Sequence, residues 1–431
     1  MKNNYKQLKT FLILWSTQSL SQLGSAMTGF ALTLWLYEKT GSALQTALLS
    51  ICSYTPYVLM SIFAGALSDR WDKKRTMLVC DTFAAGCSVL VLVLLKTNSL
   101  LPIHMYVLNV VNGLMNTVQQ PAGEVTMKLI IPKEQYQRIS GLRSFSNSLV
   151  TILHPVIATS IYAVVGMDGV IGVDLVTFIV AFVALAFCVH IPSLETQRLD
   201  GSKETVLSSA KAGLSYLRQN GLILWLILFL AGVNFVASAF GAVLSPYVLS
   251  RENGGKAVLG IVMSCAGIAT LMGSLAATIL PSPKNRIRVI FLTMLFSLGT
   301  ENFILAFTRT PIWWCIAQII GWSVVPIMSA NLDVILRNTI PTELQGRVYS
   351  CRNTMQFFTI PIGTFAGGFM VDRICEPWMA HTNPNGLLAR IFGVGKGSGA
   401  ALVMFILGIV GITICLIFER ILRKYEFNKE V

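Results

Sequence analysis

Five ionisable side chains lie within or at the edges of long apolar stretches of this sequence, where a charge is costly. Glu301 and His154 lie near the middle of their stretches, Asp174 lies towards one end, and Asp81 and Glu124 lie towards the other. Burial favours the neutral form of a carboxylic acid, and histidine changes charge near neutral pH. All five are therefore candidates for proton uptake and release. The structural alternatives are a permanently neutral Glu301, hydrogen-bonded beside its sequence neighbour, and a His154 ring that only packs.

Uncharged hydrogen-bonding side chains recur at intervals of three or four residues, which places each set on one face of a helix. In chain order they are Gln18, Gln22, Asn109, Asn112, Asn116, Asn234, Gln318 and Trp322. Amides that faced lipid would leave donors and acceptors unpaired, so these faces must contact protein or water. They predict either the wall of a largely neutral cavity for an amphiphilic ligand or hydrogen bonds that join helices.

Motifs of common enzymes are absent from the sequence. No HExxH or GxSxG occurs, so a zinc protease or a serine hydrolase has no support. The glycine-rich run at 393–399 lacks the spacing of a phosphate-binding loop. The nine cysteines are scattered and form no CxxC pair. We expect no enzymatic activity, no cofactor, no metal site and no disulfide framework.

The composition indicates a chain that lies in lipid. Of the 431 residues, 54% are hydrophobic and only 12% are charged, about half the charge of an ordinary soluble domain. The net charge of +13 does not indicate a nucleic-acid partner, because the basic residues form short clusters between apolar runs. The apolar runs must therefore form the membrane-crossing segments that position the polar side chains.

Twelve stretches are long and apolar enough to cross a bilayer as helices. They are 11–36, 43–67, 76–95, 103–122, 143–165, 169–190, 222–249, 257–280, 289–307, 311–336, 350–370 and 400–418. If the N-terminus is cytoplasmic, 25 of the 33 Lys and Arg residues fall in cytoplasmic segments and 8 fall outside. Basic residues concentrate on the cytoplasmic side of membrane proteins, so both termini are predicted to be cytoplasmic.

The longest cytoplasmic connection divides the chain into halves. We expect an N-terminal six-helix bundle at 1–190, a linker with a short amphipathic helix at 191–221, and a C-terminal six-helix bundle at 222–431. The pattern I-P-x-E-x-x-x-R-(I/V)-x-x-x-R begins at Ile131 and again at Ile340, each time after the fourth span of its half. This repeat predicts an all-α integral membrane protein of two pseudo-symmetric bundles with a binding site between them.

The connection after the second span resembles a known family. Residues 65–75 read G-A-L-S-D-R-W-D-K-K-R, similar to the G-x-L-a-D-r-x-G-r-k-r loop of the major facilitator superfamily. The departure is Asp72, which stands where that pattern has glycine.

In that superfamily the loop aspartate locks the cytoplasmic gate against the start of the eleventh span. The resemblance implies this role for Asp69, with Arg352 and the helix dipole as its partners. Gly65 would permit close helix approach, and Arg70 and Lys73 would hold the loop inside. The alternative is that these residues only set the topology.

The wider chain resembles the branch of this superfamily that includes the macrolide efflux proteins. The segments that carry the resemblance are 15–25, 40–43, 120–122, 346–348 and 376–377. Two features depart from drug–proton antiporters: His154 replaces the glycine before Pro155, and 103–122 contains no arginine. The proton route therefore stays open.

The resemblance implies a secondary transporter that exports hydrophobic, macrolide-like drugs in exchange for protons, by alternating access between the halves. We expect a monomer in the cell membrane, in contact with lipid and a small amphiphilic substrate. Two rivals stay open. One is an exporter or importer of another small molecule, such as a siderophore or a metabolite. The other is a membrane receptor that senses a ligand without transport.

Overall fold

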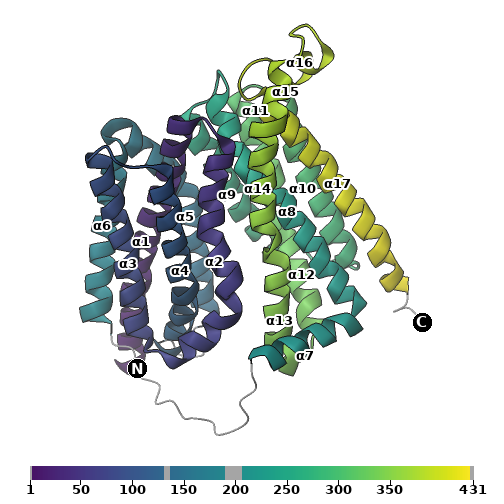
Figure 1. The fold of residues 1–431 in the computed structure, drawn as a ribbon. Helices are drawn as coiled ribbons and strands as arrows, with labels where there is room; N and C mark the ends of the chain where they lie inside the picture. Colours follow the sequence, from purple (N-terminus) through teal and green to yellow (C-terminus); the bar gives the residue numbers. More distant parts are fainter. Residues whose placement is uncertain (1, 131–135, 190–205, 428–431) are drawn as a thin grey trace. The chain divides into compact units, whose positions relative to one another are not determined.

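The structure of the protein is a computed structural model that describes residues 2–130, 136–189 and 206–427. Within these residues the chain is α-helical and contains no β-strand (Figure 1). Inside a lipid bilayer the backbone N–H and C=O groups have no water to bind, and a helix satisfies them within one segment. The structure confirms the all-α membrane fold expected from the composition.

The described chain forms two compact units, the first made of Met1–Leu36 and Cys52–Val206. In unit 1, α3 packs against α4 and α6, and α5 packs against α6. The helices that begin in the N-terminal half are α1 (Lys2–Thr40), α2 (Ala43–Arg70), α3 (Lys73–Lys96), α4 (Pro102–Ile130), α5 (Tyr136–Val165), α6 (Met167–Val183) and the π-helix η2 (Ala184–Cys188).

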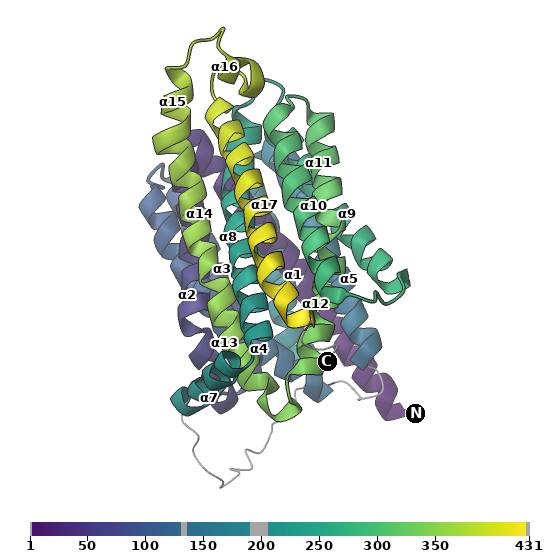
Figure 2. The ribbon, with the colours of Figure 1, turned by 90° about the vertical axis from the view of Figure 1, so that its right-hand side faces the viewer.

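Unit 2 comprises Tyr37–Ile51 and Leu207–Val431. Here α8 packs against α14, and α17 packs against α8 and α10 (Figure 2). Its helices are α7 (Val206–Gln219), α8 (Gly221–Ser250), α9 (Lys256–Ile279), α10 (Arg286–Phe307), α11 (Pro311–Ser323), α12 (Val325–Thr339), α13 (Thr342–Phe357), α14 (Thr359–Phe369), the π-helix η3 (Met370–Cys375), α15 (Glu376–Ala380), α16 (Leu387–Phe392) and α17 (Ser398–Phe427).

Nine helical segments of the described chain are long and apolar enough to cross a membrane. They are Lys73–Lys96, Leu142–Val164, Met167–Cys188, Gly221–Ser250, Lys256–Ile279, Arg286–Phe307, Pro311–Thr339, Arg347–Ala380 and Ser398–Arg423. Each of the twelve predicted spans overlaps one or two helices of the described chain, although the count of twelve crossings stays a prediction.

Proline interrupts two of the predicted spans. The stretch 311–336 is divided at Val324, between α11 and α12, just before Pro326. The stretch 350–370 is divided at Phe358, between α13 and α14, three residues before Pro361. Proline lacks the backbone N–H that would bond to the preceding turn, so helical hydrogen bonding breaks there.

Asp72, the residue that departs from the family loop, is the N-cap of α3. Its backbone is extended, and its carboxylate accepts a hydrogen bond from the backbone N–H of Arg75 at 2.8 Å. This bond satisfies one of the unpaired donors at the start of the helix, which glycine could not do. The substitution thus has a local structural reason.

A helix lies where the amphipathic linker helix was expected. Leu217 of α7 is fully buried, and the hydroxyl of Tyr216 donates to the carbonyl of Thr339 at 2.9 Å. Gly213 lies so close to α13 that an added Cβ would be 2.7 Å from the carbonyl oxygen of Arg347. These contacts attach α7 to unit 2. Residues 190–205 of the predicted linker and 131–135 of the predicted repeat lie outside the described residues.

The segment 371–399, whose Gly, Pro and Asn content suggests an irregular loop, is partly helical. It contains most of η3 and all of α15 and α16. Its glycines at 393, 395 and 397 have positive φ angles, which form the turn before α17. Glu376 organises this turn, because Oε1 accepts from the backbone N–H of Gly397 at 2.8 Å and of Ala400 at 3.3 Å. More than half of the segment is therefore helical.

Candidate functional site

Unit 1 encloses a polar cavity of about 670 Å³ among α1, α3, α4, α5 and α6. Three of the predicted amide side chains, Gln18, Gln22 and Asn116, line it. So do two of the predicted ionisable groups, Asp81 and Asp174. The structure thus brings together polar residues from four helices that the sequence could only assign to separate faces.

Asp81 of α3 joins two neighbouring helices through amide donors. Its Oδ2 accepts from Nε2 of Gln18 on α1 at 3.4 Å, and its Oδ1 accepts from Nε2 of Gln119 on α4 at 2.5 Å. Asp81 therefore fixes the positions of the amides that line its side of the cavity.

Asp174 of α6 is the more deeply buried carboxyl group, with 4% of its surface exposed. Its Oδ1 accepts from the hydroxyl of Ser25 on α1 at 3.0 Å, and its Oδ2 accepts from that of Ser88 on α3 at 2.9 Å. Gly24 permits this approach, since an added Cβ would be 2.9 Å from Cα of Asp174. The two serines and the glycine together seat the carboxyl group between three helices.

Neutral donors, rather than cations, hold both carboxyl groups. Two ion pairs of the described residues, Lys96 with Asp168 and Lys256 with Glu38, lie away from the cavity. The basic side chain among the cavity residues is Arg143. A buried carboxylate without a bound cation is a site at which a proton or another cation can be taken up.

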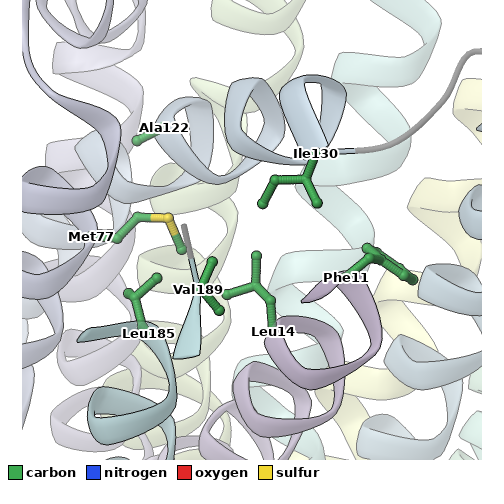
Figure 3. Packing of buried hydrophobic residues seen from close by; sticks show 7 residues of the cluster. All are labelled: Phe11, Leu14, Met77, Ala122, Ile130, Leu185 and Val189. Atoms are coloured by element: carbon green, nitrogen blue, oxygen red, sulfur yellow. The ribbon is translucent and has the colours of Figure 1, made fainter. Parts of the chain in front are cut away.

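A cluster of buried apolar side chains borders the cavity. Figure 3 shows Leu14 of α1 and Met77 of α3 pointing into this cluster, beside Leu185 and Val189. Leu14 and Met77 also line the cavity, so one layer of packed side chains forms part of its wall. The aromatic residues Trp15 and Phe178 add apolar surface. Hydrogen-bonding groups beside aromatic faces suit an amphiphilic ligand.

Unit 2 contains a further buried acid, Glu301 of α10. Its side chain is 5% exposed, and its Oε1 accepts from the indole nitrogen of Trp322 at 3.1 Å. Gln318, one turn before Trp322 on α11, is 1% exposed, and its Nε2 is buried without a hydrogen bond among the described residues. Gly321 leaves room for the Glu301 carboxyl group, because an added Cβ would be 2.4 Å from Oε2. One of the predicted cavity residues, Trp322, therefore binds the predicted proton-coupling acid.

Asn302 does not share a hydrogen bond with its neighbour Glu301. Its Nδ2 donates to the carbonyl of Leu298 at 2.8 Å, and its Oδ1 is buried without a hydrogen bond among the described residues. The structural alternative of a permanently neutral, hydrogen-bonded Glu301 stays open, with Trp322 rather than Asn302 as the hydrogen-bond donor.

The remaining predicted polar residues lie elsewhere. Asn109 donates to the carbonyl of Met105 at 2.9 Å, Asn234 donates to the carbonyl of Gln356 at 3.3 Å, and Oδ1 of Asn112 is buried without a partner among the described residues. His154 approaches the carbonyl of Val150 at 2.9 Å and contacts the Phe30 ring edge-on. Asn109, Asn234 and His154 thus lie against backbone carbonyl groups, and none of them is among the residues that line the cavity of unit 1.

Two of the predicted gating residues can be placed with their side chains. Lys73 is buried, and its Nζ donates to the carbonyl of Trp71 at 3.1 Å. Arg352 donates from Nε to Gln356 at 3.1 Å and lies over the ring of Tyr349. Gly65, Asp69 and Arg70 belong to α2 and Glu124 belongs to α4, but their side chains are outside the described set. The gating role of Asp69 stays a prediction.

Sequence reasoning did not single out Ser88 or Arg143 as cavity residues. Ser88 follows Asp81 by seven residues on α3, and this interval puts both on one helix face. That spacing is the signal that would have identified Ser88. Arg143 is the last residue of the repeat that begins at Ile131 and corresponds to Arg352 in the second copy, so its place in the repeat is the signal that would have identified it.

Proteins of similar sequence are named as efflux proteins or transporters. A macrolide efflux protein A of Streptococcus pyogenes is 27% identical over 377 residues, which cover 86% of this chain and 91% of that protein. The multidrug efflux pump Tap of Mycolicibacterium fortuitum is 24% identical, covering 86% and 90%. The staphyloferrin A transporter of Staphylococcus aureus is 21% identical, covering 96% and 97%.

Solved structures share the fold. The nucleoside transporter NupG has a TM-score of 0.65 at 13% identity, with 97% of this chain and 99% of that chain covered. A bacterial homologue of the iron transporter ferroportin has a TM-score of 0.67 at 14% identity, with 95% and 99% covered. The family profile of the Major Facilitator Superfamily matches residues 14–374. The chain is therefore a multi-pass membrane transporter, not an enzyme, and it belongs to the Major Facilitator Superfamily.

Proposed function

We propose that this transporter exports hydrophobic, macrolide-like drugs from the cell in exchange for protons. The observation that carries the proposal is the cavity of unit 1, where Asp81 and Asp174 are held by neutral donors beside amide and aromatic side chains. The similarity to proteins named for macrolide and multidrug efflux supports the substrate class.

In this account the carboxyl groups of Asp81, Asp174 and Glu301 exchange protons during transport. A protonated acid is neutral and a deprotonated acid is charged, so each exchange changes the charge that the surrounding hydrogen-bond donors must stabilise. Differential stabilisation of two conformations by the proton and by the drug is sufficient to couple their movements. His154 and Glu124 remain secondary candidates for the same role.

The protein would act as a monomer in the cell membrane, with both termini in the cytoplasm and lipid around its helices. The distribution of Lys and Arg supports this orientation. Protons are the proposed coupling ion, because the buried titratable groups named above are available to carry them.

Uptake into everted membrane vesicles tests the function. An imposed gradient, acid inside, should drive accumulation of macrolides and of other hydrophobic drugs in a panel, and an uncoupler should abolish it. Siderophores and polar metabolites serve as the comparison substrates. Gradient-driven accumulation of these instead of the drugs would replace the proposed substrate, and ligand binding without any flux would favour a receptor.

A further inference from the structure

The six-residue pattern at the end of the second span occurs again in the eleventh. Residues 65–70 read G-A-L-S-D-R, and residues 368–373 read G-F-M-V-D-R. The first copy lies on the side predicted to be cytoplasmic, and the second lies on the side predicted to be external. The second copy contains Asp372, which sequence reasoning did not select, and its contacts are described.

Asp372 holds the beginning of α2. Its Oδ2 accepts from the hydroxyl of Ser42 at 2.5 Å and from the backbone N–H of Leu44 at 2.8 Å. Its Oδ1 accepts from the backbone N–H of Ala43 at 3.0 Å. Three donors at a helix N-terminus, where the helix dipole also favours an anion, make a strong contact.

Gly368, one turn before Asp372, brings the two helices together. A Cβ at this position would be 2.8 Å from Cα of Leu44 and 3.0 Å from Cβ of Ala47. The pattern G-x-x-x-D therefore has two linked functions here. The glycine permits close approach, and the aspartate binds the helix end that this approach brings within reach.

Further contacts attach the same segment to unit 2. The Tyr37 hydroxyl donates to the carbonyl of Pro246 at 3.3 Å, and Glu38 forms an ion pair with Lys256. Tyr37–Ile51 belongs to unit 2 by its contacts, although α1 and α2 both continue into unit 1. Contacts that hold Tyr37–Ile51 in unit 2 therefore restrain the end of α1 and the start of α2, whose other residues belong to unit 1.

The contact can break without unwinding α2. Ser42 is itself an N-terminal cap, since its hydroxyl oxygen accepts from the backbone N–H of Gln45 at 3.1 Å. Asp372 also lines a cavity of about 460 Å³, so water could solvate the released carboxylate. When Asp372 is released, Ser42 still caps Gln45, and water in this cavity could bind the freed N–H groups of Ala43 and Leu44.

We propose that Asp372 is a gating residue, a latch on the external side that must close and open in each transport cycle. Its carboxylate closes on the first turn of α2 and holds it against Gly368. The proposal requires that the chain be a transporter, but it does not depend on which substrate is carried or on proton coupling. It is therefore tested with any substrate that the wild-type protein transports.

Cysteine labelling tests whether the latch restrains the segment. In a variant without native cysteines, Gln45→Cys places a thiol in the cavity that Asp372 lines. Replacing Asp372 by Asn or Ala should increase labelling by a membrane-impermeant maleimide about fivefold, because loss of the contact with α2 opens the cavity to the reagent. Glu252→Gln, which changes an exposed acid on the same side, should leave labelling unchanged. Equal labelling in all variants would overturn the proposal.

Cross-linking tests whether the latch must open. The pair Gln45→Cys and Arg373→Cys, which line the same cavity and leave Ser42 and Asp372 in place, joined by a bis-methanethiosulfonate reagent in cell membranes, should stop transport, and reduction should restore it. A cross-linked protein that transports at the rate of the reduced protein would overturn the proposal. If the reduced pair itself does not transport, the labelling of Gln45→Cys remains the decisive measurement.

Discussion

The indole nitrogen of Trp322 donates a hydrogen bond to Oε1 of Glu301 at 3.1 Å, in the buried interior of unit 2. This bond joins α10 to α11, and Gly321 makes room for it. The bond links the titratable Glu301 to Trp322 of α11, a helix that ends just before the break at Val324. A change of charge at Glu301 would therefore act on α11 directly.

Glu301→Gln should separate coupling from substrate binding. Glutamine keeps the shape and an acceptor for Trp322 but cannot exchange a proton. We expect gradient-driven drug accumulation to fall about tenfold, within the usual range of coupling free energies, while exchange of drug for drug continues. Everted vesicles measure both. Loss of exchange together with accumulation would instead indicate a structural or binding role.

Asp174→Asn should have the same signature in unit 1. The amide can replace only part of the hydrogen bonding that the carboxylate offers to Ser25 and Ser88, and it cannot exchange a proton. Accumulation driven by the gradient should fall while drug exchange persists. Asp168→Asn is the matched control, because its ion pair with Lys96 is partly exposed and such pairs contribute little. Equal losses in the two variants would contradict the assignment.

Gly321→Ala should destabilise unit 2 and displace Glu301. The added Cβ would be 2.4 Å from Oε2, a distance that requires the carboxyl group or the helix to shift. Overpacking of this kind costs about 1–3 kcal/mol, which thermal unfolding in detergent can detect. Gly241→Ala on α8 meets nothing within 4 Å and serves as the control. If both variants unfold at the wild-type temperature, the close packing at Gly321 is wrong.

Asp72 offers a prediction about stability alone. Asp72→Ala removes the cap of α3 and should cost about 1 kcal/mol, whereas Asp72→Gly, which restores the family residue, should cost only a few tenths. Thermal unfolding of the two variants, compared with that of the wild type, checks the order. A larger loss of thermal stability for Asp72→Gly than for Asp72→Ala would show that Asp72 stabilises the loop by more than capping α3.

The helices could be predicted because long apolar stretches leave few alternatives inside a bilayer. Periodicity also gave the polar faces, but it does not say what each face meets. Asn109, Asn112 and Asn116 share one stripe, yet only Asn116 lines the described cavity. Whether an asparagine of this stripe lines the cavity depends on where along α4 the neighbouring helices leave space. The spacing of residues along α4 alone does not give that position.

Long-range contacts account for what the sequence did not reveal. Asp372 lies in a π-helical turn and binds residues some 330 positions earlier in the chain. No local pattern marks Ser42 as its partner, and only the repeated G-x-x-x-D-R sequence hints that it differs from other acids. The break at Val324 was missed for a simpler reason, since Pro326 is embedded in an otherwise continuous apolar run.

Proton movement during drug transport is the most direct test of the proposed function. Purified protein in liposomes that enclose a pH-sensitive dye should move protons when a macrolide is added outside, in the direction opposite to the drug. The liposomes with Glu301→Gln should show a drug flux by exchange but no proton signal. Macrolide flux in the wild-type protein without any change of internal pH would contradict proton-coupled export.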